Sequence, residues 1–254
     1  MKHLSSLLQI IAILWLSTSW SFAVFILNPY RFTTAPPPPP PGGDEHFASV
    51  VLLLHCDGTN GSTTFTDNAS TPKTITAFGD AQVTTTNSKF GTGAMLLDGT
   101  GDYVATASAS DDFNFETSTD FTLECWANLQ GVNDAYFFGT QNRSLYFGVF
   151  GGSIVLGNGV VNPMIYVANY AAYRNKWTHV ALTRAGTTLR VFLDGEVKQT
   201  VASSTFFGAN SAMNVGREPN HSNFNGRIDE ARITKGVARY TANFTPPTAP
   251  FPDS

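Results

Sequence analysis

Glu124 and Trp126 are the residues whose types and spacing best fit a binding chemistry. They occupy alternate positions in residues 121–129 (FTLECWANL), and alternate residues of a β-strand point to the same face. An indole ring offers an apolar surface on which a sugar ring can stack, and a carboxylate accepts hydrogen bonds from hydroxyl groups. This pair therefore predicts a carbohydrate-binding surface, provided that the segment is a strand.

Three further residues are expected to point outward on neighbouring strands. In residues 177–184 the alternation places Val180 and Leu182 in the core, so His179 and Thr183 face the other way. The same period places Phe192 outward in residues 188–193. Two interpretations stay open: the side chains bind a ligand, or they satisfy one another beneath a covering loop.

Several aspartates could serve as ligands of a calcium ion. Ca²⁺ takes six to eight oxygen ligands, usually from carboxylates and from the carbonyl groups of loops. Asp57 and Asp67 flank a loop rich in Gly, Thr and Asn, and the other candidates are Asp98, Asp102 and Asp229. Turns also use aspartate to bind their own backbone, and Asp98-Gly99 is typical of that use.

The sequence favours binding over catalysis. Glu124 and Glu230 could lie on neighbouring strands, as the two carboxylates of a glycosidase do. The sequence contains no Gly-x-Ser-x-Gly, no His-Glu-x-x-His and no Gly-rich phosphate loop. We therefore expect a protein that is not an enzyme.

Composition excludes some functions and leaves others open. Only 13% of the residues are charged and the net charge is −4, so there is no basic surface for nucleic acid. Hydrophobic residues make up 42%, including 20 Phe, which is enough for a large core and makes assembly of several copies a further prediction. Two cysteines, Cys56 and Cys125, are either buried thiols or one disulfide bond.

The N-terminal part differs from the rest of the chain. Residues 1–23 have a short basic start, an apolar run and small residues before a cleavage position, which is the layout of a secretory signal. An uncleaved membrane anchor or an assembly tail remains open. Residues 24–47 contain an apolar peptide from Val24 to Phe32 and a proline run, Pro36 to Pro41, that forms a stiff spacer of about 20 Å. The peptide is a candidate contact with other subunits of a virion or surface layer.

Residues 48–254 have the pattern of an all-β domain. Short apolar runs alternate with clusters of Gly, Asn, Asp and Thr, and no long stretch has helical spacing. Asp194-Gly195 between two such runs predicts a type I′ hairpin turn. The predicted strands are 50–56, 74–78, 82–84, 94–97, 103–105, 121–129, 135–139, 145–150, 153–156, 164–167, 177–184, 188–193, 196–201, 214–215 and 226–234.

The order of these segments resembles the laminin G-like domains of the concanavalin A-like lectin superfamily, in its bacterial and phage branch. The resemblance covers about residues 48–250 and rests on blocks at 52–58 (LLLHCDG), 93–104, 120–126, 177–184, 189–195 and 226–233 (GRIDEARI). Cys56 and Cys125 stand where the family more often has an aromatic residue. The Glu-x-Asp-x-x-Glu cluster of related glucanases is absent.

The resemblance implies a two-sheet antiparallel jelly-roll sandwich with one concave outer face. Ligands would bind on that face or at rim loops near a calcium ion. The concave face would carry the ligand-binding set Glu124, Trp126, His179, Thr183 and Phe192. Because the family brings the last block near the first, the metal set would be Asp57, Asp67 and Asp229.

Two functions are consistent with this sequence. The first is a non-enzymatic adhesion module, displayed outside the cell or on its surface, that binds a glycan or a cell-surface polymer. The second is a structural protein of a phage virion, such as a capsid decoration, fibre or tail component on the virion surface. In the second case, the N-terminal segment would anchor the domain to its shell.

Overall fold

The computed structural model describes residues 43–131, 134–160, 164–208, 210–220 and 223–254. The chain divides into two units at Pro38 and Pro39, and every described residue belongs to the second unit. The predicted signal (1–23), apolar peptide (Val24 to Phe32) and proline run lie outside the described residues. Within the described part of the chain, no helix has the length and apolar character that crossing a bilayer requires.

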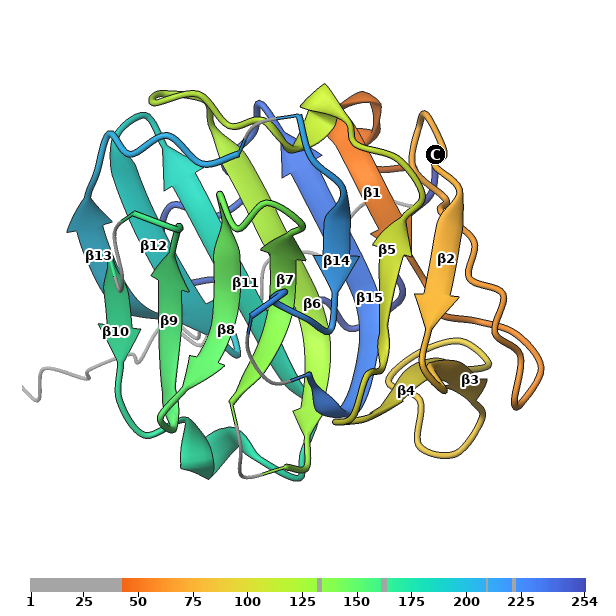
Figure 1. Cartoon of the computed structure of the whole chain (residues 1–254). Helices are drawn as coiled ribbons and strands as arrows, with labels where there is room; N and C mark the ends of the chain where they lie inside the picture. Colours follow the sequence, from red (N-terminus) through yellow and green to blue (C-terminus); the bar gives the residue numbers. More distant parts are fainter. Residues whose placement is uncertain (1–42, 132–133, 161–163, 209, 221–222) are drawn as a thin grey trace, which may run out of the picture. The chain divides into compact units, whose positions relative to one another are not determined.

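The described residues form two antiparallel sheets that face each other (Figure 1). The strands of the larger sheet are β1 Val50–Leu54, β3 Gln82–Thr84, β4 Ala94–Asp98, β6 Phe121–Leu129, β11 Thr178–Ala185, β12 Thr188–Leu193, β13 Glu196–Ala202 and β15 Asn225–Lys235. Their order is β13-β12-β11-β6-β15-β4-β3, and β1 also pairs with β15.

The smaller sheet lies in front of the larger one in Figure 1. Its strands are β2 Ile75–Phe78, β5 Tyr103–Thr106, β7 Ala135–Thr140, β8 Tyr146–Phe150, β9 Ser153–Gly157, β10 Ile165–Val167 and β14 Met213–Val215. Their order is β10-β9-β8-β7-β14-β5-β2. Three short 3₁₀ helices, Phe47–Ser49, Asp111–Phe113 and Tyr170–Tyr173, complete the described elements.

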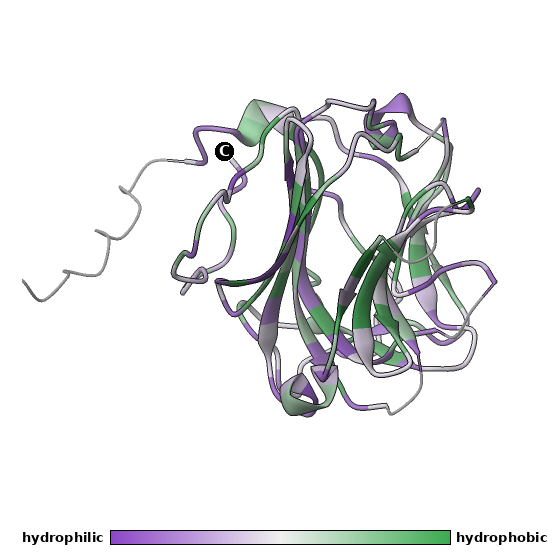
Figure 2. Ribbon diagram, turned by 90° about the vertical axis from the view of Figure 1, so that its left-hand side faces the viewer, coloured by the Kyte–Doolittle hydropathy of each residue, from purple (hydrophilic) through white to green (hydrophobic). Residues whose placement is uncertain are grey.

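The predicted jelly-roll sandwich is confirmed, with 44% strand and 5% helix. Each predicted strand segment overlaps an observed strand, and only the ends differ by one or two residues. The reason is visible in β6, whose inward residues Phe121, Leu123 and Cys125 belong to the core between the sheets. Figure 2 shows the two layers side by side, with hydrophobic stretches along their strands.

The hairpin turn between β12 and β13 is also confirmed. Asp194 and Gly195 have φ values of 50° and 77°, which a type I′ turn requires at both central positions. A side chain at position 195 would also collide with the chain at Phe244, because an added Cβ would lie 2.0 Å from its carbonyl oxygen. Glycine at this position therefore serves both the turn and the close approach of the C-terminal segment.

The two cysteines are separate buried thiols. Cys56 and Cys125 are both free, so of the two alternatives the disulfide does not form. Burial raises the pKa of each thiol above its usual value. A thiol that stays protonated is a poor nucleophile and a poor metal ligand, so both residues act as small core side chains.

The packed domain begins before the predicted boundary at residue 48. Asp44 lies within hydrogen-bonding distance of both Arg232 and Arg239, and its backbone N–H donates to the Ser254 carbonyl at 2.7 Å. Phe47 packs against a small cluster that includes Phe251. Residues 44–47, which the sequence analysis assigned to the linker, are therefore part of the fold.

Candidate functional site

The five residues predicted to bind a ligand lie together on the outer face of the larger sheet. His179 is opposite Trp126 in the pairing of β11 with β6, and Ala181 is opposite both Glu124 and Phe192. The predicted alternation is therefore correct. Of the two interpretations left open by the sequence, the structure favours the covered face, because none of the five residues, which include Thr183, is more than 5% exposed.

Residues 237–254, here called the C-terminal strap, cover most of this face. Tyr240 and Phe244 stack on each other with ring centroids 3.6 Å apart. Both rings pack against Phe192 and His179. The C-terminus lies on the outer side of the larger sheet in Figure 2. The strap thus occupies the surface that the sequence analysis assigned to a sugar.

A nearby loop covers the remaining aromatic residue, Trp126. The Nζ atom of Lys89 lies 3.8 Å from the centroid of the indole ring, and Phe90 contacts the same ring edge-on at 5.9 Å. The exposed fraction of Trp126 is 5%. Neither ring face is open to a sugar, so the covering-loop interpretation is the one that the structure supports.

Glu124 is the centre of a buried network of charges under the strap. Its Oε1 atom accepts hydrogen bonds from Arg232 Nε at 2.9 Å and Nη2 at 2.8 Å. Its Oε2 atom accepts one from the Tyr240 hydroxyl at 2.8 Å and lies 3.2 Å from His179 Nε2. Burial raises the pKa of Glu124, but Arg232 and His179 outweigh it and lower the pKa to about 2. The carboxylate stays ionised because its partners are fixed.

This network predicts how the domain responds to acid. The folded pKa of Glu124, about 2, lies below its ordinary value of 4.5. The ion therefore stabilises the fold above pH 4.5, and this contribution, roughly 3 kcal/mol, is lost as the pH falls through the folded pKa. Urea unfolding between about pH 6 and pH 2 should show a steeper loss of stability for the wild type than for Glu124→Gln. Equal slopes would contradict the assignment.

The predicted metal ligands bind backbone N–H groups instead. Asp67 accepts bonds from Leu53, Ala69 and Lys73 at 2.8–3.0 Å. Asp229 accepts bonds from the N–H groups of Lys89, Phe90 and Glu230 at 2.8–3.1 Å, and Asp57 accepts one from Gly93 at 3.0 Å. Asp102 accepts bonds from the backbone N–H groups of Asp80 and Asp98, and Asp98 accepts one from Thr100 in its own turn.

These aspartates do not fit a calcium ion. Asp67 and Asp229 are buried at 3% and 0% exposure, with their oxygens pointing at N–H donors. Among the residues that the structure describes, no group of three or more His, Cys, Asp and Glu side chains could hold a metal. The geometry therefore favours the alternative interpretation, in which the aspartates support loops.

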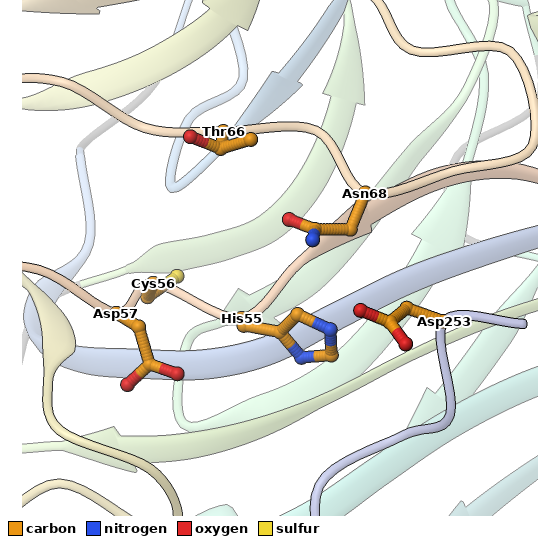
Figure 3. A pocket seen from close by; sticks show the side chains of 6 residues that line it. All are labelled: His55, Cys56, Asp57, Thr66, Asn68 and Asp253. Carbon is orange, nitrogen blue, oxygen red and sulfur yellow. The ribbon is translucent and has the colours of Figure 1, made fainter.

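Figure 3 shows a polar hollow of about 360 Å³ close to the end of β1. Its lining residues are His55, Cys56, Asp57, Thr66, Asn68 and Asp253. Asp57 and Asp253 lie on opposite sides of the His55 ring, and Asn68 and Thr66 lie on a neighbouring segment. The volume is at the lower end of the range for small-molecule sites, roughly 300–1,000 Å³.

Several polar groups around this hollow are free to bind a ligand. The side chains of Thr66, Asn68 and Asp253 have no hydrogen-bond partner among the described residues. Asp57 accepts its hydrogen bonds through Oδ1, and its Oδ2 has no partner among the described residues. They offer both donors and acceptors. This distinguishes the hollow from the strap-covered face, where Glu124 and Thr183 are fully engaged.

Glu230 contacts two of the segments that line the hollow, the one at His55 and the strap. This residue is 1% exposed, and its Oε1 lies 2.9 Å from His55 Nδ1. Its Oε2 accepts the Phe251 N–H at 2.8 Å and so fixes the strap two residues before Asp253. The bond to Glu230 raises the pKa of His55. Like Glu124, Glu230 is turned away from solvent, so the two carboxylates do not form an open catalytic pair.

A family model for the concanavalin A-like lectin/glucanases superfamily matches residues 98–239, more than half of the 254 residues. The chain belongs to this superfamily. The match confirms the family that the order of blocks predicted from sequence. No curated protein sequence matches the chain.

Solved structures share the superfamily fold at low sequence identity. The binding domain of Paraclostridial Mosquitocidal Protein 1 has a TM-score of 0.58 and 13% identity, over 76% of this chain and 50% of that one. Domain 4 of AbnA, an extracellular arabinanase from Geobacillus stearothermophilus, was solved with arabinotriose. It has a TM-score of 0.54 and 20% identity, over 75% of this chain and 94% of that one. The binding domain of Botulinum neurotoxin DC in complex with SialylT has a TM-score of 0.52 and 16% identity, over 73% of this chain and 48% of that one.

The chain thus spans about half the length of the two toxin domains and nearly all of the arabinanase domain. Among the residues that line the hollow, His55, Thr66, Asn68 and Asp253 were not predicted from the sequence. His55 lies two residues before Asp57, just after a buried strand, and these two polar residues were the available signal. Nothing local to Asp253 indicates that the strap returns to the same place.

Proposed function

We propose that the chain is a non-catalytic carbohydrate-binding module, displayed outside the cell, and that the polar hollow binds the sugar. The observation that carries this proposal is the set of free polar groups on Thr66, Asn68, Asp57 and Asp253 around one hollow. Sugar hydroxyls both donate and accept hydrogen bonds. They can therefore pair with the amide, hydroxyl and carboxylate groups that line the hollow. Two of the similar structures are complexes, with arabinotriose and with SialylT, which supports a glycan ligand.

Phe78 provides the rival binding surface that a test must separate from the hollow. Its ring is 39% exposed and stacks on Tyr103 at 4.4 Å, so its other face is open to solvent. Sugars also stack on exposed aromatic rings. The hollow offers several directed hydrogen bonds, whereas Phe78 offers one ring face.

Binding should be measured on a glycan array and then by calorimetry with the best ligand. Asn68→Ala removes one neutral hydrogen-bonding side chain and should weaken binding by about tenfold. Phe78→Ala is the matched control and should leave the affinity unchanged. The proposal fails if the wild type binds no glycan, or if Phe78→Ala abolishes binding while Asn68→Ala does not.

A further inference from the structure

Two carboxylates, those of Asp57 and Asp253, line the hollow. Asp57 and Asp253 lie on either side of His55, and no Lys or Arg lines the hollow. The bond to Glu230 raises the pKa of His55, and the charges of Glu230, Asp253 and Asp57 act in the same direction. Glu230, 2.9 Å from the imidazole, balances the positive charge that the ring carries when it is protonated, so the carboxylates of Asp57 and Asp253 leave the hollow with a net negative charge.

We propose that the hollow selects neutral, hydroxyl-rich sugars and rejects sugars that carry a carboxylate. This inference rests on the proposed function and adds the class of ligand. A neutral sugar donates its hydroxyl hydrogens to Asp57 Oδ2 and to Asp253, and hydrogen bonds to an ionised acceptor are stronger than neutral ones. The Asn68 amide donates to a hydroxyl or ring oxygen of the same sugar.

An acidic sugar would be repelled by the carboxylates of this hollow. Its carboxylate would lie within a few ångströms of two like charges, with no Lys or Arg in the lining to offset them. Repulsion at that distance near a protein surface lowers affinity by about tenfold or more. Because Asp57 and Asp253 are exposed, salt screens part of the effect. The selectivity should therefore be largest at low ionic strength.

The test compares matched ligands on the full chain. A panel of neutral oligosaccharides is titrated by calorimetry at low salt, each beside a counterpart that carries one sialic or uronic acid. The wild type should bind the neutral member at least about tenfold more tightly. Asp57→Asn with Asp253→Asn should bring the two affinities close together, because both substitutions keep an acceptor oxygen and remove a charge.

Asp80→Asn is the matched control, since Asp80 is exposed and does not line the hollow. It should keep the wild-type preference. If the double variant does not fold, Asp253→Asn alone serves, because the Asp253 side chain has no bond to another described residue. Equal or tighter binding of the acidic member by the wild type would overturn the inference and leave the proposed function standing. Absence of binding to either member would overturn both.

Discussion

Arg232→Met should destabilise the domain by about 3–5 kcal/mol, because it leaves the Glu124 carboxylate buried without its main partner. Glu124 is 0% exposed, and Arg232 supplies two of its hydrogen bonds. Methionine preserves most of the apolar stem and removes the guanidinium group, which also lies 3.7 Å from the centroid of the Phe251 ring and binds Asp44, so the loss reports on the charged group. The free energy of unfolding in urea is the measurement.

Two further variants separate the ion pair from general damage. Arg227→Met, on the same strand, is the matched control, because Arg227 Nε has no hydrogen-bond partner among the described residues. It should change stability by less than about 0.5 kcal/mol. Glu124→Gln combined with Arg232→Met should recover much of the loss, since replacing both members of a buried pair removes the unpaired charge. A double variant as unstable as Arg232→Met would contradict this account.

The strands were predictable because their information is local. In β6 and β12 the alternation of apolar and polar residues matches the observed faces, and Asp194-Gly195 specifies its own turn. Such patterns depend on a few consecutive residues, so distant contacts do not alter them. The family could be inferred for the same reason, from ordered local blocks.

The covering of the predicted face was not predictable in this way. Alternation correctly places Glu124 on the outer face of the sheet. It does not tell whether that face is exposed to solvent or covered by another segment of the protein. The strap has no strand period and contains several prolines, among them Pro246 and Pro247, so no strand and no position on a sheet face was predicted for it. Its aromatic residues, Tyr240 and Phe244, were the available signal, because large rings in an irregular segment need something to pack against.

The hollow depends on still longer-range information. Its residues come from the end of β1, from the following loop and from the strap, and only Asp57 was predicted from the sequence to bind a ligand, as a metal site. The virion alternative depends on residues 1–41, outside the described residues, and none of the three similar structures reported above is named as a virion protein. That alternative remains a prediction.

Glu230 has a strained backbone conformation in the middle of a strand. It has a φ of 50° in the middle of β15, where the register with β6 shifts between Asp229 and Arg232. A residue with a side chain pays about 1 kcal/mol in this left-handed region, and glycine does not. The contacts of the carboxylate with His55 and Phe251 must therefore offset backbone strain.

Glu230→Ala should cost about 2–4 kcal/mol, since it keeps the strain and leaves the Phe251 N–H and the His55 ring without their acceptor. Glu230→Gly loses the same contacts but relieves the strain, and should be about 1 kcal/mol more stable than the alanine variant. Glu230→Gln keeps an acceptor and should be the most stable of the three. Urea unfolding gives this order. An alanine variant more stable than the glycine variant would contradict it, since glycine is normally the worse residue in a strand.

The same variants test whether Glu230 positions the hollow. The glutamine side chain has no charge, so the pKa of His55 should fall toward its usual value, which a proton NMR titration of the ring would show. Without the bond to the Phe251 N–H, the amide hydrogens near the end of the strap should exchange faster in Glu230→Ala, while those of β6 keep their order of protection. Sugar affinity should fall along with strap protection, because Asp253 reaches the hollow only when the strap is fixed. Faster exchange with unchanged affinity would show that Glu230 stabilises the fold without positioning the site.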